Sequence, residues 1–286
     1  MRPLNAPDWL VSRPIAHRGL HDAANGVIEN TLAAAEAAIG QGFAIECDVQ
    51  LSADEEVFVF HDDALDRLTD KTGALGAKSA AEIRKARIVA PDSGDAVRGA
   101  STDGGPLRHF GRARRAQLQA PIPTLSEFLA RVAARVPIVC ELKSRFDSDW
   151  RIGDRVAALA ASYDGPLALK SFDPDLVAYL RLRHPLLGPG GRPCPIGIVA
   201  EATYDDPYWA FLAPDQKRAC ESFDHRGRSE PDFLSWNVDD LPHRTPFFEK
   251  ALHGLPVMTW TVRTPAQREA ALKWADQIVF EGEGRP

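Results

Sequence analysis

The sequence lacks the features that mark several classes of protein. Cysteine is scarce: Cys47, Cys140, Cys194 and Cys220 are widely spaced and form no Cys-x-x-Cys pair. This excludes a small disulfide-bonded scaffold and a zinc knuckle. No run of about 18 uncharged apolar residues occurs, so the sequence predicts no transmembrane helix and no stable membrane insertion.

Basic residues do not outnumber acidic ones. The chain has 34 Lys and Arg against 40 Asp and Glu, a formal net charge of −6, which disfavours a nucleic-acid partner. The start of the chain also lacks the pattern of a secretion signal, because residues 1–13 contain two prolines and Asp8. Together with the few cysteines, this predicts a reduced, cytoplasmic protein.

Length and patterning favour one α/β domain. Dividing the 286 residues by about 150 residues per domain suggests two, but α/β barrels routinely exceed that length as one unit. The composition, 44% hydrophobic and 26% charged, is that of a soluble globular chain. Short apolar runs alternate with helix-like stretches, and their continuous hydrophobicity is typical of strands buried on both faces. The runs are Pro14–Ala16, Phe43–Glu46, Pro137–Glu141, Leu167–Lys170, Ile196–Ala200, Phe233–Trp236, Val257–Trp260 and Gln277–Phe280.

Helix starts can be located between several of these runs. Asn30 or Thr31 can cap a helix that follows the first run. Asp173-Pro174 and Thr264-Pro265 each combine a capping residue with a proline at the first helical position. Eight strands, each followed by a crossover segment, predict a (β/α)8 TIM barrel that forms a single domain over residues 1–286.

One strand-like segment does not fit the alternation. Val57–His61 is separated from the strand that runs through Glu46 and Asp48 by Ser52–Glu56 only, which is too short for a crossover helix. The sequence therefore predicts an antiparallel hairpin. A turn centred near Ala53–Asp54 would bring His61 roughly opposite Glu46.

Residues from about 63 to 121 match no barrel element. We expect an inserted loop or small subdomain over the barrel mouth after the hairpin, because long connections in compact domains are usually functional or disordered. A short helix is expected around Ala80–Ile88, and weak order over Val97–Gln119.

Three carboxylates are expected to meet at the C-terminal ends of the strands, where such barrels have their active sites. Glu46 and Asp48 project from the same face of one strand, and Glu141 ends another. With no basic group between them they would repel, and a divalent cation, Mg²⁺ or Ca²⁺, would remove that repulsion. The alternative is a set of surface acids paired with Arg18 and Lys143.

Two histidines, His17 and His61, flank this trio. Either one alone would more often be a satisfied core residue, but a pair beside a metal can exchange protons near neutral pH. Arg18 and Lys143 are cationic donors suited to phosphate, and Lys170 either contacts phosphate or balances charge. A metal, an acid–base pair and a phosphate clamp together indicate phosphodiester cleavage.

In this combination the chain resembles the glycerophosphodiester phosphodiesterases. Each block alone would be a weak signal, but the blocks occur in order from Ala16 to Val262 and are specific together. They are Ala16-His17-Arg18-Gly19, Glu29-Asn30-Thr31, Gly42–Gln50, Val59-Phe60-His61-Asp62, Ile122-Pro123-Thr124-Leu125, Glu141-Leu142-Lys143 and Trp260-Thr261-Val262.

The resemblance implies a role for each matching position. His17 and His61 would be the general acid and base, with their order left open. Glu46, Asp48 and Glu141 would bind the metal, and Arg18 and Lys143 would bind the phosphate. Trp260 would line the substrate pocket, and Glu29 and Asn30 would hold the loop after the first strand in place. Members of the family commonly let the neighbouring glycerol hydroxyl attack phosphorus, and water then opens the cyclic phosphate. The products would be sn-glycerol 3-phosphate and a free alcohol, from a small-molecule glycerophosphodiester.

Three positions depart from the family pattern. Ile28 replaces the usual proline, Ser52–Glu55 replaces the usual hairpin turn, and Phe280-Glu281 replaces the usual Thr-Asp. None removes a catalytic group, so the departures bear on the substrate end of the pocket. Two alternatives remain open: a related phosphodiesterase acting on lipid or lysophospholipid, and a non-catalytic phosphate-binding module.

Overall fold

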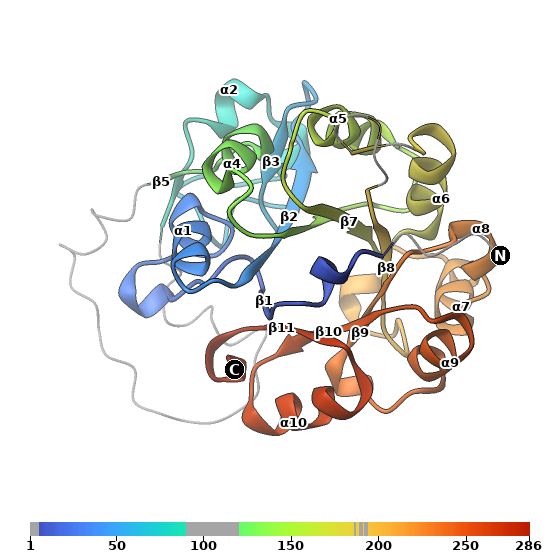
Figure 1. Cartoon of the computed structure of the whole chain (residues 1–286). Helices are drawn as coiled ribbons and strands as arrows, with labels where there is room; N and C mark the ends of the chain where they lie inside the picture. Colours follow the sequence, from blue (N-terminus) through green and yellow to red (C-terminus); the bar gives the residue numbers. More distant parts are fainter. Residues whose placement is uncertain (1–5, 90–119, 186, 189–190, 192–193) are drawn as a thin grey trace.

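The chain folds into a closed parallel β-barrel surrounded by helices. The computed structural model describes residues 6–89, 120–185, 187–188, 191 and 194–286. Within these residues, eight parallel strands follow one another around the ring, and β1 pairs with both β2 and β11 to close it. Figure 1 shows the ring of strands enclosed by helices. The predicted (β/α)8 TIM barrel is confirmed.

Each predicted apolar run overlaps one barrel strand. The longest strand continues past its run through Glu46 and Asp48, so both carboxylates lie within a strand. The barrel strands are β1 (Ile15–Ala16), β2 (Ala44–Leu51), β6 (Ile138–Leu142), β7 (Leu167–Ser171), β8 (Ile196–Ala200), β9 (Leu234–Asn237), β10 (Val257–Val262) and β11 (Gln277–Phe280).

The helices begin where the sequence indicates. Thr31 caps the first, its hydroxyl accepting a hydrogen bond from the Ala34 backbone N–H. Asp173 and Thr264 cap the two helices that start with proline. The helices are α1 (Leu32–Gly40), α2 (Ala80–Ile83), α4 (Leu125–Val132), α5 (Arg151–Ala160), α6 (Pro174–Arg183), α7 (Pro214–Ser222), α8 (Arg226–Ser229), α9 (Arg244–His253) and α10 (Pro265–Trp274). None of these described helices is both long and apolar enough to cross a bilayer.

The lower part of the barrel interior is filled by apolar side chains. Leu10, in a short 3-10 turn η1 (Asp8–Leu10), packs there against Val139, Phe233 and Met258. Gly197 makes room for this packing, since a Cβ on it would lie 2.4 Å from the Phe233 ring. Each fully buried side chain of this size contributes about 1.5–3 kcal/mol.

Alternation along the strands places polar groups directly above this apolar layer. Ala44, Val139 and Ala168 belong to the apolar layer, so the residues two positions further along each strand point inward as well. Those residues are Glu46, Glu141 and Lys170. The residues between them point outward to the helices, where Cys47 and Cys140 lie in the main core. All four cysteines are buried free thiols.

The antiparallel hairpin is present, with a register close to the predicted one. Strand β3 (Val57–Val59) pairs with β2 so that Val49 faces Val59. This register is centred on Asp54, half a residue beyond the expected turn centre. The pairing ends at Val59, and the Phe60 N–H still donates to the Asp48 carbonyl at 2.9 Å, so His61 follows directly after the residues paired with β2.

The first part of the predicted insertion forms a small folded unit. Residues 63–89 bury a core of their own, in which Leu65, Leu75 and Ile83 pack with Ile28. Ile28, which replaces the usual family proline, therefore serves as a contact for the insertion.

The helix expected over Ala80–Ile88 is shorter than predicted. It ends after Ile83, and the chain continues into strand β4 (Arg87–Ile88), which pairs with β5 (Ala120–Pro121). The segment Val97–Gln119, expected to be weakly ordered, lies outside the described residues. The single-domain assignment stays a prediction.

Candidate active site

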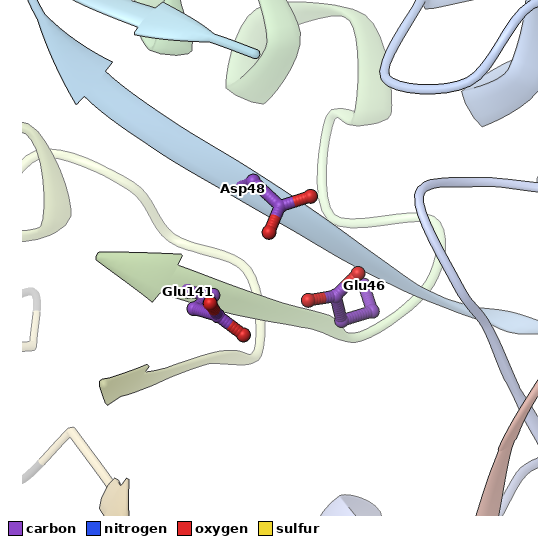
Figure 2. Close-up of side chains that lie close together, drawn as sticks. All are labelled: Glu46, Asp48 and Glu141. Atoms are coloured by element: carbon purple, nitrogen blue, oxygen red, sulfur yellow. The ribbon is translucent and has the colours of Figure 1, made fainter. Parts of the chain in front are cut away.

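The three predicted carboxylates converge in the upper barrel. Asp48 and Glu141 face each other across β2 and β6, and Glu46 lies two residues before Asp48 on the same face (Figure 2). One oxygen from each residue lies within 4.8 Å of the others. The side chains are 0%, 1% and 5% exposed for Glu46, Asp48 and Glu141, respectively. Buried carboxylates this close require positive charge nearby.

Two lysines supply part of that charge. The Lys143 ammonium lies 2.6 Å from Glu141 Oε1 and 2.9 Å from Asp48 Oδ1. The Lys170 ammonium lies 3.1 Å from Glu46 Oε1 and 3.2 Å from Glu141 Oε2. The assumption that no basic group stands among the carboxylates is therefore wrong. The reason is the register, which places Lys170 directly beside Glu141. Lys170 balances charge. The alternative is wrong in placing the acids at the surface, but the pairing with Arg18 and Lys143 that it expected is present.

The carboxylate trio still fits a divalent cation. Its donors are hard oxygens, the type that Mg²⁺ and Ca²⁺ prefer. Among the described residues, buried Glu46 Oε1 accepts no hydrogen bond of good geometry. Burial opposes ionisation, but the Lys143 and Arg18 charges hold the pKa of Asp48 well below its usual range. Asp48 is thus ionised at neutral pH, as metal binding requires of a carboxylate ligand.

His17 is oriented by a carboxylate from the last strand. Its Nδ1 hydrogen-bonds Glu281, which also contacts Arg263 Nε at 2.8 Å. Because an ionised carboxylate only accepts hydrogen bonds, His17 Nδ1 carries the proton. Nε2 then faces the site, 3.9 Å from Glu46 Oε2. Burial opposes ionisation of Glu281, yet the charge and hydrogen bond of His17 lower its pKa.

His61 is held by a carboxylate in the same way as His17. Its Nδ1 lies 2.8 Å from Asp62 Oδ1. Asp62 is in turn held by Arg67 through two hydrogen bonds of 2.6 and 2.8 Å. Burial, together with the Arg18 and Lys143 charges, lowers the pKa of His61. His61 is therefore neutral at pH 7, with Nε2 free to accept a proton.

Arg18 and Asn30 adopt left-handed backbone conformations, both with φ of 56°. Asn30 donates to Asp48 Oδ2 at 2.9 Å and accepts from the Asp48 backbone N–H at 3.3 Å. Gly19 follows with φ of +80°, and a Cβ there would lie 2.7 Å from the Ala34 Cβ. Tight packing of this loop on α1 thus fixes the residues that touch Asp48.

Glu29 links two arginines behind the site. It lies 2.7 Å from Arg18 Nη1 and 2.8 Å from Arg67 Nη2. Burial opposes its ionisation, but the two guanidinium groups lower the pKa of Glu29 to about 2. Arg67 therefore joins the support of Arg18 to that of His61.

The other side of the mouth is aromatic. Trp260 donates to the Ser235 carbonyl at 3.0 Å and meets Phe172 edge-on at 5.5 Å. Trp236, in β9, is 1% exposed and stacks on His243. It is a packing residue, whereas Trp260 remains at the mouth.

Glu201, at the end of β8, was not selected from the sequence. Trp209 Nε1 donates to one of its oxygens, and Asn237 Nδ2 lies 3.3 Å from the other. Burial raises the pKa of Glu201 to about 7. Its position directly after a predicted strand was the sequence feature that could have marked it as a residue near the site. Glu281 had the same signal, whereas Arg67, inside the insertion, had none.

A cleft of ≈ 450 Å³ opens beside Lys143. The insertion lines one side with Asp63 and Gly76, and Tyr208 and Phe211 line another. A small organic group fits in such a volume next to the charged site.

Comparison with known proteins agrees with this geometry. The sequence profile of the glycerophosphoryl diester phosphodiesterase family matches residues 17–281. The chain belongs to this family. It is therefore a phosphoric diester hydrolase, and the sequence-based assignment is confirmed. A Bacillus subtilis (strain 168) protein named "Putative glycerophosphodiester phosphodiesterase YhdW" is 27% identical over 212 residues, which are 73% of this chain and 72% of that protein.

Solved structures in the family share the fold. An Oleispira antarctica phosphodiesterase in complex with the product sn-glycerol-3-phosphate is 21% identical, with a TM-score of 0.66 over 95% of this chain and 93% of that one. The glycerophosphodiester phosphodiesterase of Thermotoga maritima is 19% identical, with a TM-score of 0.60 over 93% of this chain and 92% of that one.

Proposed function

We propose that the enzyme hydrolyses glycerophosphodiesters to sn-glycerol 3-phosphate and a free alcohol, with a divalent cation held by Glu46, Asp48 and Glu141. One observation carries the proposal: a buried trio of oxygen donors lies near two imidazoles, each with its Nδ1 held by a carboxylate. Such a site combines charge stabilisation with proton transfer, which phosphodiester cleavage needs.

His61 is proposed as the general base of the first step. Its lowered pKa and its contact with Asp62 leave a neutral Nε2 to accept a proton. His17, whose Nδ1 is held by Glu281, then donates a proton to the leaving alcohol from Nε2.

In the proposed first step, the glycerol hydroxyl next to the phosphate attacks phosphorus and loses its proton to His61. The bond from phosphorus to the alcohol oxygen breaks, and His17 protonates that oxygen. In the second step the roles reverse: His17 accepts a proton from water as it opens the cyclic phosphate, and His61 returns its proton to the glycerol oxygen.

Mg²⁺ and Ca²⁺ are the proposed ions. When bound, such a cation offsets charge on the phosphoryl oxygens and favours the ionised hydroxyl. Arg18 and Lys143, which are 15% and 14% exposed at their side chains, are proposed to bind the phosphate. Trp260 is proposed to line the substrate pocket.

The cleft beside Lys143 is proposed to receive the alcohol. It adjoins a proposed phosphate ligand, and its volume suits a small headgroup. A cytoplasmic location is also proposed, supported by four cysteines that are all free thiols.

The first prediction tests the metal and the reaction together. Treatment with EDTA should abolish release of sn-glycerol 3-phosphate, because it removes the cation that would offset charge on the phosphoryl oxygens, and Mg²⁺ or Ca²⁺ should restore it. Phosphorus-31 NMR of a panel of glycerophosphodiesters, with a lysophospholipid included, would measure this. Full turnover in chelator would reject the metal; hydrolysis of the lysophospholipid alone would reject the substrate class.

A further inference from the structure

Lys170 has no part in the proposed reaction, yet it lies among the metal ligands. Asp48, Glu141 and Lys170 form one row across β2, β6 and β7. Lys170 is 2% exposed, and its ammonium lies 3.1 Å from Glu46 Oε1 and 3.2 Å from Glu141 Oε2. It thus contacts two of the three proposed ligands from inside the barrel wall.

The position of Lys170 makes it a counter-ion for both glutamates. Its ammonium lies within 3.2 Å of a carboxylate oxygen of each, and its side chain is 2% exposed. An ammonium at this position attracts the two glutamates toward a common point. It also repels any second cation that approaches the same oxygens, because Coulomb interactions are strong where water is excluded.

The second lysine of the site differs from Lys170 in its freedom to move. Lys143 lies one residue past the end of β6, with its side chain 14% exposed, and it lines the cleft. Its ammonium can turn toward the cleft. Lys170 lies inside β7, and its side chain is 2% exposed, so its charge stays with the carboxylates whether or not a divalent ion is bound.

We propose that Lys170 is a permanent counter-charge that holds Glu46 and Glu141 in place in the metal-free protein and limits the affinity of the site for divalent cations. This inference rests on the proposed metal site. It assigns Lys170 as a positioning residue that acts through the metal ligands.

Removing this charge should move two quantities in opposite directions. The metal-free protein should become less stable, since two buried carboxylates lose their partner. The metal-bound protein should be affected less, because the divalent ion itself compensates the carboxylates. Metal binding must therefore become tighter, as the cycle linking folding and binding requires.

The experiment compares Lys170→Met and Lys170→Gln with the wild type, using isothermal titration with Ca²⁺ and Mg²⁺ and thermal unfolding in EDTA and in excess metal. We expect Kd to fall about tenfold or more and the melting temperature in EDTA to fall by about 5–10 °C. Most of that loss should be recovered in metal. Lys170→Arg, which keeps the charge, should resemble the wild type.

A matched control separates this effect from general loss of a buried ion pair. Arg181 Nη2 lies 2.5 Å from Asp232 Oδ2, and the Arg181 side chain is 8% exposed. Neither residue belongs to the carboxylate trio. Arg181→Met should lower the melting temperature equally in EDTA and in metal, with Kd unchanged.

Two outcomes would overturn the inference: unchanged or weaker metal binding in the Lys170 variants, or equal loss of stability with and without metal. If a variant fails to fold in EDTA, folding it in excess Ca²⁺ supplies the comparison, and failure there as well would also overturn it. If the wild type binds neither ion, the proposed metal site fails first, which distinguishes the two proposals.

Discussion

At the scale of single residues, His17 and His61 are both held in one tautomer by a carboxylate. Each ring has its Nδ1 against a carboxylate, Glu281 or Asp62, so each presents Nε2 to the site. A fixed tautomer is needed for a histidine to take up a proton in one step and return it in the next.

This arrangement predicts a large and selective loss on truncation. His17→Ala and His61→Ala should each lower kcat by about 10²–10⁴-fold, the usual contribution of a positioned acid or base. The loss should leave metal affinity within a few-fold of the wild type, measured by titration calorimetry. Near-normal turnover in either variant would remove that histidine from the mechanism. His243→Ala, at a ring stacked on Trp236, is the control.

Glu201 gives a prediction about stability. Its pKa in the folded protein is about 7, against 4.5 for an unperturbed glutamate, because of burial. Between these values the folded state holds a proton that the unfolded chain has released, so the contribution of Glu201 to stability falls as pH rises from about 4.5 to 7.

Glu201→Gln should therefore stabilise the protein at pH 8, by about 1–3 kcal/mol, and change it little at pH 4. Urea denaturation at both pH values measures the difference. An equal effect at the two pH values would show that the carboxyl is not perturbed by burial.

At the scale of elements, the insertion contacts the partners of two proposed active-site residues from outside the barrel. Arg67 belongs to it and bonds both Asp62, behind His61, and Glu29, behind Arg18. Its own core, which includes Ile28, attaches it to the loop that precedes α1. The insertion thus sets the orientation of two groups that it does not itself contain.

Arg67→Gln should lower kcat/KM by about 10–100-fold, as is typical when the support of an active-site ligand is lost. The melting temperature should change little, since Arg67 is about one-third exposed at 34%. The Nδ1 proton resonance of His61 should shift, which a purely structural role would not cause. Arg84→Gln, at an exposed insertion pair with Glu127, should have no effect on kinetics; equal losses in both variants would contradict this role.

The elements were also the most predictable part of the fold. Apolar runs and capping residues such as Thr31 and Asp173 are local, so they identify strands and helix starts directly. The helix expected through Ile88 was too long, because pairing of β4 with β5 outweighs local preference over Arg87–Ile88.

At the scale of the whole molecule, prediction depended on register. The sequence places Glu46, Asp48 and Glu141 at the correct end of the barrel, because strand ends gather at one edge. It did not place Lys170 between them, since that position follows from the pairing of Glu141 with a residue 29 positions later in the chain, a pairing local patterns do not encode. The pairing of residues on neighbouring strands is therefore the part of the site that the sequence does not predict.

The apolar packing around Leu10 has a kinetic consequence. Side chains from η1 and the strands fill the barrel below the carboxylates, so the lower end of the barrel is closed to substrate. Among the described residues, the route to the carboxylates is therefore from the upper end of the barrel. In the proposed reaction, the alcohol would depart before a water molecule approaches from the side that it vacated, and the glycerol phosphate would leave last. The order of product release would thus depend on apolar packing at the end of the barrel opposite to the active site.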